Sequence, residues 1–512
     1  MTRVEIAIVG AGFAGLGMAI ALRRAGRTDF VVLERAASVG GTWRDNTYPG
    51  VACDVPSHLY GFADYPNPDW SGVFAKGDEI RGYLEDVAER ERLGDRLRLR
   101  TPVLGAEWDA AASVWHIRTG GDDPGSIEAG VLVLACGRLT EPAIPDIPGL
   151  ETFPGPLFHS SRWDHDADLT GTRVALVGTG ASAVQVLPEL ARSASRVILF
   201  QRTPAWIVPR GGAAYTDEDR RLFAEHPDAL ERLRADLYRE GEARFASRSG
   251  DASAAAAARS IALEHLHAQV SDPALRSVLT PDYAFGCKRV LLSDDFYPAV
   301  SSRSVTLEPS ALASVDGRML TSKDGTVTEV DALVLATGFA STRQPYAELV
   351  RGEGGVALAD HWSQGMTSFG STVVSGFPNM FVLNGPNASL GHNSSVLMIE
   401  EQAAYAVRAL ELRDAREALG DDVLRVSSAA EEQYTDEIAA AARTTPWIAG
   451  GCRNWYVDER SGRLTLLWPG TVDAFRERLA RADGSEFVPS AARHSQTKGA
   501  SSAAPPTGRV TP

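Results

Sequence analysis

The chain has 512 residues, of which 44% are hydrophobic and 23% are charged, so it can form two or three domains with sizeable cores. Its net charge of −15 disfavours a nucleic-acid partner or an anionic membrane. The four cysteines, Cys53, Cys136, Cys287 and Cys452, lie far apart and form no C-x-x-C motif. This spacing argues against a redox disulfide, a zinc site or an iron–sulfur cluster, and it predicts a cytoplasmic protein without a metal.

A βαβ unit opens the chain. Residues 4–9 predict a strand, residues 10–15 read Gly-Ala-Gly-Phe-Ala-Gly, a helix of small residues follows to about Ala25, and residues 30–34 predict a second strand. The uncharged stretch 6–22 resembles a signal peptide or a membrane span. It is short for a bilayer, and the glycine spacing explains it better.

The next elements are more varied. A helix is expected at about residues 78–93, a β-hairpin around Trp108 and Trp115, and a buried strand over residues 131–136. Five prolines between Pro142 and Pro156 resist helix formation and suit a crossing between domains.

A second βαβ unit follows, with strands at residues 173–177 and 197–200 around the loop Gly178-Thr179-Gly180-Ala181-Ser182-Ala183. We predict an α/β protein with two Rossmann-like dinucleotide-binding domains, the second inserted in the first, and a helical insertion. The expected boundaries are 1–145 and 341–488 for the first domain, 150–210 and 286–340 for the second, 211–285 for the helical insertion and 489–512 for a disordered tail.

Both glycine loops have a strand before them and a helix after them, which makes them stronger signals than an isolated motif. Gly10 permits a tight turn, Gly12 lets the backbone approach a pyrophosphate, and Gly15 lets helix and strand pack closely. The helix N-terminus offers free N–H groups to the phosphates. In the second loop Gly178 and Gly180 take the first two places, and Ala183 takes the third.

Opposite charges follow the two loops at the same distance. Glu34 lies 22 residues after Gly12, and Arg202 lies 22 residues after Gly180. A carboxylate accepts hydrogen bonds from ribose hydroxyls, whereas a guanidinium pairs with a 2′-phosphate. The first site therefore favours FAD and the second NADPH, with Thr203 adding a hydroxyl beside Arg202. The alternative is two unrelated surface charges.

Two longer patterns resemble one enzyme family. Phe153-x-Gly155-x-x-x-His159-x-x-x-Trp163 matches F-x-G-x-x-x-H-x-x-x-W, and the run from Gly40 to Asp54 matches G-G-x-W-x-x-x-x-Y-P-G-x-x-x-D. Both are patterns of the type I Baeyer–Villiger monooxygenases, which the chain resembles over roughly residues 4–480. The first pattern also occurs in related N-hydroxylating flavin enzymes, so the second carries more weight.

The resemblance implies an FAD- and NADPH-dependent enzyme that uses O₂ to insert an oxygen atom beside a ketone carbonyl, through a peroxide at flavin C4a, and gives an ester or lactone. It assigns Arg289 to the active-site cation, Asp54 to the carboxylate that orients it, and Lys288 to a contact with the 2′-phosphate. A guanidinium keeps its charge at any working pH, which suits that role. The plain alternatives are an exposed strand residue for Arg289 and a turn or N-cap residue for Asp54.

Weaker expectations concern rings. Trp43 is expected to pack over the flavin or in ordinary core, and His159 to act as a hinge residue or a structural histidine. Trp455 corresponds weakly to a family tryptophan over NADP, and His392 has no clear role. The aromatic residues expected to line an apolar ketone pocket are Tyr60, Phe62, Phe296 and Tyr297.

Three rival functions use similar parts. An N- or S-oxygenating flavin monooxygenase would use the neutral C4a-hydroperoxide, and the pattern from Gly40 to Asp54 together with Arg289 argues against it. An uncoupled NADPH oxidase and a redox-sensing flavoprotein also remain. Formation of ester in proportion to NADPH consumed distinguishes all three from the first interpretation.

Overall fold

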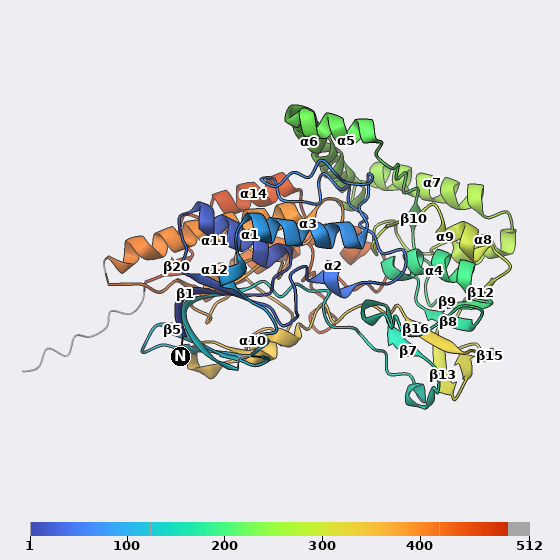
Figure 1. Cartoon of the computed structure of the whole chain (residues 1–512), viewed down its shortest axis with the longest axis horizontal. Coiled ribbons are helices and arrows are strands. Elements are labelled where there is room, and N and C mark those ends of the chain that lie inside the picture. The colour runs from blue at the N-terminus through green and yellow to red at the C-terminus, as the bar shows by residue number, and fades with distance from the viewer. Residues whose placement is uncertain (1, 123, 419, 490–512) are drawn as a thin grey trace, which may run out of the picture.

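The computed structural model describes residues 2–122, 124–418 and 420–489. Helices flank two separate, mostly parallel sheets, which confirms the predicted α/β class with two Rossmann-like units (Figure 1). Apart from Pro489, the expected tail lies outside the described residues. None of the helices in the described ranges is long and apolar enough to cross a membrane.

The larger sheet has the strand order β17-β4-β5-β6-β1-β2-β3, and β18 also pairs with β6. Its strands are β1 (Thr2–Val9), β2 (Phe30–Leu33), β3 (Leu97–Arg98), β4 (Val103–Asp109), β5 (Val114–Thr119), β6 (Gly125–Leu134), β17 (Val350–Arg351) and β18 (Met380–Val382). Val9 pairs with Leu33 on one side and with Leu134 on the other, all in parallel. The carboxyl ends of these three strands therefore reach the same edge of the sheet.

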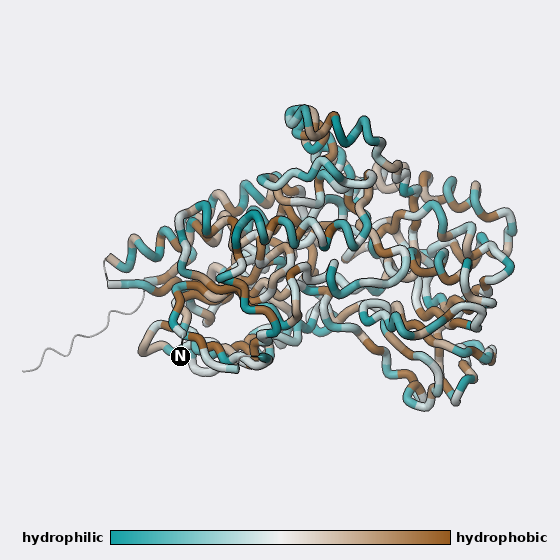
Figure 2. The backbone as a smooth tube through the Cα atoms, in the orientation of Figure 1, coloured by the Kyte–Doolittle hydropathy of each residue, from teal (hydrophilic) through white to brown (hydrophobic). Residues whose placement is uncertain are grey.

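Helices from both ends of the sequence cover this sheet. They are α1 (Phe13–Arg24), α2 (Thr42–Asp45), α3 (Gly77–Arg90), α10 (Leu358–His361), α11 (Ser395–Glu417), α12 (Ser428–Ala442), α13 (Pro446–Ala449) and α14 (Val472–Ala480). α1 packs against α11, so the C-terminal part of the chain completes the domain that the N-terminal part begins (Figure 1). Hydrophobic segments gather in this sheet (Figure 2), and where β1 and β6 pair, residues 6–8 and 131–134 are all buried, as expected when both faces are covered.

The second sheet is wholly parallel, with the order β12-β9-β8-β16-β7. It contains β7 (Leu157–His159), β8 (Arg173–Val177), β9 (Arg196–Phe200), β12 (Val305–Glu308) and β16 (Ala332–Leu335), together with the helices α4 (Ala181–Ser193) and α9 (Phe296–Val300). A small antiparallel sheet lies beside it, formed by β13 (Leu312–Asp316), β14 (Met319–Ser322) and β15 (Val327–Glu329). All of these elements lie in the sequence between β6 and β17 of the larger sheet.

Four helices interrupt the second unit: α5 (Asp217–Glu225), α6 (Pro227–Ala243), α7 (Ala252–Gln269) and α8 (Pro273–Leu279). The side chains of Thr216, Asp251 and Asp272 accept hydrogen bonds from the first turns of α5, α7 and α8, which fixes where these helices begin. α5 and α6 project from the body of the molecule (Figure 1). Two short pairs complete the fold, β10 (Ile207–Val208) with β11 (Leu291–Leu292) and β19 (Arg425–Val426) with β20 (Phe487–Val488).

Candidate active site

The first glycine loop is so tightly packed that two of its positions exclude a side chain. Gly10 has φ +106°, and a Cβ there would lie 2.5 Å from the carbonyl oxygen of Ala135. A Cβ on Gly15 would lie 1.9 Å from the carbonyl oxygen of Gly10. Gly12 begins α1 without a side-chain cap, so the first N–H groups of that helix stay available to a phosphate. The loop fits the pyrophosphate of a dinucleotide.

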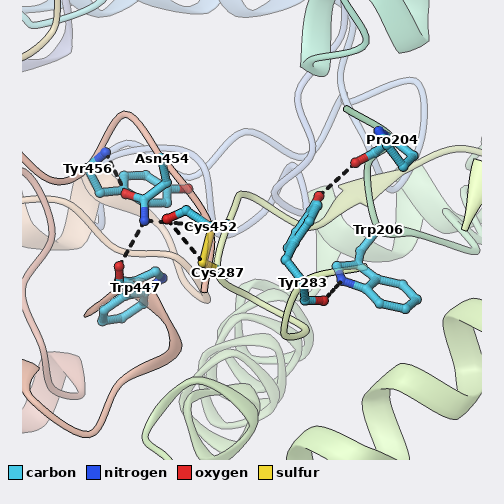
Figure 3. The surroundings of a disulfide bond; sticks show 8 residues. All are labelled: Pro204, Trp206, Tyr283, Cys287, Trp447, Cys452, Asn454 and Tyr456. Atoms are coloured by element: carbon cyan, nitrogen blue, oxygen red, sulfur yellow. Dashed lines mark hydrogen bonds between the residues drawn. A yellow bond between two sulfur atoms is a disulfide. The ribbon is translucent and has the colours of Figure 1, made fainter. Parts of the chain in front are cut away.

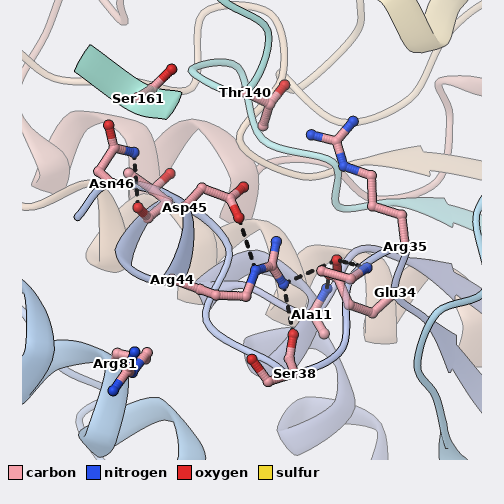
Figure 4. Close-up of polar contacts among 12 residues, drawn as sticks. Ala11, Glu34, Arg35, Ser38, Arg44, Asp45, Asn46, Arg81, Thr140 and Ser161 are labelled. Atoms are coloured by element: carbon pink, nitrogen blue, oxygen red, sulfur yellow. Dashed lines mark hydrogen bonds and ion pairs between the residues drawn. The ribbon is translucent and has the colours of Figure 1, made fainter. Parts of the chain in front are cut away.

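Glu34 lies at the end of β2 and is held from three sides (Figure 4). Its Oε2 accepts a hydrogen bond from the Ala11 N–H at 2.9 Å, and its Oε1 accepts one from the Ala36 N–H at 2.9 Å. Arg44 Nη1 lies 3.0 Å from the same Oε1. Glu34 is 4% exposed, so this buried carboxylate is paired as buried charges require. Sequence reasoning missed Arg44, because no spacing rule links it to Glu34.

The second glycine loop has the same shape with more room. Gly178 has φ +113°, and a Cβ there would lie 2.5 Å from the carbonyl oxygen of Ala336. A Cβ on Gly180 would meet nothing within 4 Å, and Ala183 is fully buried. Thr179 Oγ1 donates a hydrogen bond to the carbonyl oxygen of Thr203 at 2.8 Å. This contact ties the loop to the segment that carries Arg202.

Arg202 and Lys288 approach one another although both are cations. Arg202 is exposed, and the Lys288 ammonium lies 5.0 Å from the centre of the Tyr283 ring. Burial lowers the pKa of Lys288, and the positive charge of Arg202 lowers it further. Neither residue forms an ion pair with a carboxylate among residues 2–122, 124–418 and 420–489. Two converging cations of this kind fit a phosphate group.

Arg289 and Asp54 form a bidentate ion pair between the two units. Arg289 Nη2 lies 2.8 Å from Asp54 Oδ1 and 2.7 Å from Oδ2, and Arg289 Nε lies 3.1 Å from Oδ2. The Asp54 carboxylate raises the pKa of Arg289 above its usual value, although burial opposes this. The pair is partly buried and 235 residues apart in sequence, so the fold fixes a permanent cation at this point.

The segment that carries Asp54 is held by the second unit. Tyr48 Oη donates to Gln185 Oε1 on α4 at 2.9 Å, and Gln185 Nε2 donates to the Ala52 carbonyl oxygen at 2.9 Å. Gly50 has φ +82°, and a Cβ there would lie 2.7 Å from the Gln185 carbonyl oxygen. Arg210 Nη2 donates to the Cys53 carbonyl oxygen at 2.9 Å. Sequence reasoning missed Gln185 and Arg210, which belong to no motif.

The predicted pocket aromatics separate into two groups. Tyr60 lies near the ion pair: the Trp43 Nε1 donates to its hydroxyl at 3.3 Å, and the charge of Asp54 affects its pKa. Phe62, like Tyr60, packs against Phe13, but it is 3% exposed in the core of the larger unit. Phe296 and Tyr297 on α9 are each 2% exposed in the core of the second unit. Assigning these last three to a pocket was wrong, because burial against neighbouring elements, rather than a nearby motif, decides which way a ring points.

A disulfide joins Cys287 to Cys452, with Cα atoms 6.2 Å apart (Figure 3). The cysteine spacing argued only against a redox disulfide and did not predict this bond, because the fold brings together cysteines 165 residues apart in sequence. The Ala284 N–H donates to the Gly450 carbonyl oxygen at 3.1 Å beside it. The bond therefore links the segment before Arg289 to the C-terminal loop. It also removes the cysteine argument for a reducing compartment.

The same C-terminal loop carries Trp455 and Tyr456, whose rings lie 4.4 Å apart. Asn454 holds the turn: its Nδ2 donates to the Trp447 carbonyl oxygen at 2.8 Å, and its Oδ1 accepts from the Tyr456 N–H at 3.0 Å (Figure 3). Tyr456 is 1% exposed, and its hydroxyl lies within electrostatic range of Arg289. Trp455 is partly buried beside it, rather than in direct contact with the ion pair.

Two histidines singled out from the sequence are buried. His159, at the end of β7, is 3% exposed and its Nδ1 lies 2.9 Å from the Ser161 hydroxyl. Burial lowers its pKa to about 4, so the ring is neutral at pH 7. His392 packs against Phe245 and lies 3.6 Å from a carboxylate oxygen of Glu242, and burial lowers its pKa. Within the described residues no cluster of three possible ligands could hold a metal ion.

Comparison with known proteins gives three kinds of match. Residues 3–219 match the family model described as flavin-binding monooxygenase-like. Baeyer–Villiger monooxygenases of Streptomyces coelicolor and Pseudomonas aeruginosa are 45% and 41% identical to the chain, over 94% of its length and 92% and 91% of theirs. Solved structures of similar fold include a steroid monooxygenase bound to NADP, with 29% identity and a TM-score of 0.83. The match covers 95% of this chain and 99% of that structure's chain. Cyclohexanone monooxygenase from Rhodococcus sp. Phi1 bound to NADP⁺ has 26% identity and a TM-score of 0.84 with the same coverage.

Proposed function

The chain belongs to the Baeyer–Villiger monooxygenases, and on this premise we propose which of its residues carry the reaction. It is an FAD-dependent enzyme that uses NADPH and O₂ to insert one oxygen atom beside a ketone carbonyl, which gives an ester or a lactone. When bound, FAD supplies the activation of O₂ and NADPH supplies the reducing hydride. The chain itself supplies binding, orientation and a fixed electrostatic environment.

Arg289 acts as the catalytic cation. Its guanidinium stands where the two dinucleotide-binding units meet, and the bidentate pair with Asp54 is the observation that carries this role. Negative charge develops on oxygen as the atom is transferred to a carbonyl, and a preorganised cation in a partly buried site stabilises that charge. Because Asp54 raises its pKa, Arg289 keeps its proton throughout.

Asp54 is a positioning residue. It aims the guanidinium through both carboxylate oxygens, and its own segment is held by Gln185 and Arg210. A cation that is already oriented needs no reorganisation during the reaction, which is the physical advantage of the pair. Loss of the Asp54 carboxylate would leave Arg289 charged but free to turn away.

The remaining predicted residues bind the cofactors. Gly10, Gly12, Gly15 and Glu34 would hold the adenosine diphosphate half of FAD, and Trp43, which bonds Tyr60, would contact the flavin. NADPH is held by Gly178, Gly180, Ala183, Arg202, Thr203 and Lys288. The clash distances at both loops, the fixed Glu34 carboxylate and the converging cations support this division. A cytoplasmic location stays a prediction, and the cysteines no longer support it.

The test uses purified holoenzyme with a panel of neutral ketones, and it measures ester by mass spectrometry against NADPH consumed. We expect Arg289→Ala to retain FAD and to lose ester formation. The rate of ester formation should fall by roughly 10²–10³-fold, as when one group that stabilises negative charge is removed from other active sites. Asp54→Ala is expected to slow oxygen transfer while flavin reduction by NADPH changes little.

Arg318→Ala is the matched control, because Arg318 pairs with Asp331 at the surface of the second unit. Its ester yield per NADPH should equal that of the unaltered enzyme. Full ester formation by Arg289→Ala would refute the assigned role of Arg289. A loss confined to flavin reduction in Asp54→Ala would show that Asp54 serves NADPH instead.

A further inference from the structure

The buried Tyr456 hydroxyl lies within electrostatic range of several charged side chains. Arg138, Arg248 and Arg289 all lie within electrostatic range of that hydroxyl, as does Asp54. Arg289 already pairs with Asp54 through both of its carboxylate oxygens. Among the residues that the structure describes, neither Arg138 nor Arg248 forms an ion pair with a carboxylate. Two positive charges beside the ion pair therefore lack a counter-charge.

Arg138 follows β6 at the carboxyl edge of the larger sheet, the edge that also carries the first glycine loop. Its two terminal nitrogens donate to neutral acceptors, the side-chain oxygens of Asn384 and Ser389. Its Nε is buried and has no hydrogen-bond partner. Burial lowers the pKa of Arg138 to about 10, and the positive charge of Arg289 acts in the same direction.

Arg248 reaches the same place from the helical insertion. It ends the 3₁₀ turn Arg244–Arg248, and its Nη1 donates to the Arg244 carbonyl oxygen and the Ser247 hydroxyl, both at 3.0 Å. Its side-chain carbons pass 3.5 Å from where a Cβ on Gly286 would lie and 3.6 Å from where one on Gly391 would lie. These are ordinary packing distances, so Arg248 contacts the loop of residues 384–391, to which Arg138 also bonds through Asn384 and Ser389.

Arg138 and Arg248 are half-buried without a counter-charge from any described residue, which is unfavourable, so this arrangement fits a ligand that brings a negative charge. The cofactor phosphates have other partners, namely the helix N-termini at Gly12 and Gly180 and the cations Arg202 and Lys288. We propose that Arg138 and Arg248 bind a carboxylate on the ketone, so that the substrates of this enzyme are oxo acids. The proposal rests on the function above, because the carbonyl must reach Arg289 at the same time.

The first experiment measures binding without turnover. Holoenzyme containing FAD and NADP⁺ is titrated by calorimetry with unbranched carboxylates from butanoate to decanoate and with the matching amides. The best carboxylate is expected to bind at least about tenfold more tightly than its amide, as one charge-assisted hydrogen bond implies. Arg138→Gln and Arg248→Gln should each remove most of this difference.

Arg239→Gln is the matched control, because Arg239 is exposed on α6 and pairs with Asp236. It should keep the carboxylate preference. Equal affinity of acids and amides along the whole series would overturn the proposal. So would loss of FAD, or a raised KM for NADPH, in either glutamine variant, since the charge would then belong to a cofactor.

The second experiment uses turnover of 6-oxoheptanoate and of its methyl ester. We expect a higher kcat/KM for the acid, and both glutamine variants should lower kcat/KM for the acid at least about tenfold more than for the ester. Equal losses for the two ketones would mean that the arginines serve the flavin, and the proposal would fall. Selective binding of carboxylates without any oxygenated product would instead count against the proposed function and leave the anion site intact.

Discussion

The two dinucleotide-binding units repeat the same opening but prepare their sites differently. In the first, Glu34 is buried and already held by two N–H groups and Arg44. In the second, Arg202 is exposed and stands near Lys288 with no carboxylate paired to either among the described residues. The first site is complete before its ligand arrives, as suits a cofactor that stays bound. The second presents two cations that no carboxylate of the described residues neutralises, which fits a cosubstrate that brings a phosphate.

The third position of the glycine loop gives the largest predicted contrast. In Gly15→Ala the new Cβ would lie 1.9 Å from the Gly10 carbonyl oxygen, so we expect loss of FAD from the purified protein. Ala183→Gly in the second loop should keep FAD and NADPH use, with stability lowered by about 1–2 kcal/mol through helix propensity and loss of a buried methyl group. Flavin absorbance per protein and thermal unfolding measure both. A yellow, active Gly15→Ala would show that the close packing of α1 is dispensable.

Arg202→Ala is expected to have the next largest effect. A charge-assisted contact with the 2′-phosphate is worth about 1.5–3 kcal/mol, so KM for NADPH should rise by roughly 10- to 150-fold. KM for NADH should change little, because NADH has no 2′-phosphate. Steady-state kinetics with both nucleotides measure this directly. Equal changes for the two nucleotides would contradict the division of labour between the two units.

Lys288→Met should act in the same direction with a smaller effect. The ammonium is partly buried, and its pKa is lowered by burial and by Arg202. It therefore loses its proton more readily than a guanidinium does. We expect KM for NADPH to rise by a factor of about 3 to 10. Because Lys288 precedes Arg289, ester yield per NADPH is the control and should not change. A fall in that yield would assign Lys288 to the chemistry instead.

The smallest predicted effect is on stability, and here the two units behave alike. His58 in the first unit and His159 in the second are buried, and burial lowers the pKa of each to about 4. Unfolded histidine binds a proton below about pH 6.5, whereas these folded rings do not, so the free energy of unfolding falls as pH drops from about 6.5 to 4. Between pH 7 and 5.5 the loss is roughly 1 kcal/mol for each histidine.

Urea unfolding of His58→Gln and His159→Gln at the two pH values checks this. Each variant should show a shallower pH dependence than the unaltered protein, since one buried neutral ring has been removed. If the pH dependence of the free energy of unfolding is unchanged in both variants, then other groups cause the loss of stability at low pH. A change in only one would show that the two units differ in this respect too.

The sequence predicts local features well and long-range ones poorly. Both glycine loops can be predicted because strand, turn and helix follow one another within about thirty residues. Neighbouring residues in the sequence therefore determine the geometry of each loop. Arg44 escaped notice because its contact with Glu34 depends on how a later loop folds back. Gln185, Arg210 and Arg138 lie in no motif, and only the assembled fold places them.

Side-chain direction is the other limit. Phe296 and Tyr297 follow the motif-bearing segment closely, yet both point into the core of the second unit. Short helices such as α9 carry too few turns for a periodic pattern to reveal their buried face. The disulfide escaped prediction for a related reason, because spacing along the chain does not report distance in space.

That bond has a practical consequence for anyone handling the enzyme. It closes a loop of 165 residues, which in the chain-entropy account stabilises the folded protein by about 5 kcal/mol. It also fastens the segment two residues before Arg289 to the loop that presents Tyr456, so thermal motion at one is passed to the other. We therefore expect reduction by dithiothreitol to lower stability and to loosen the segment before Arg289, so a reductant in the storage buffer becomes an experimental variable.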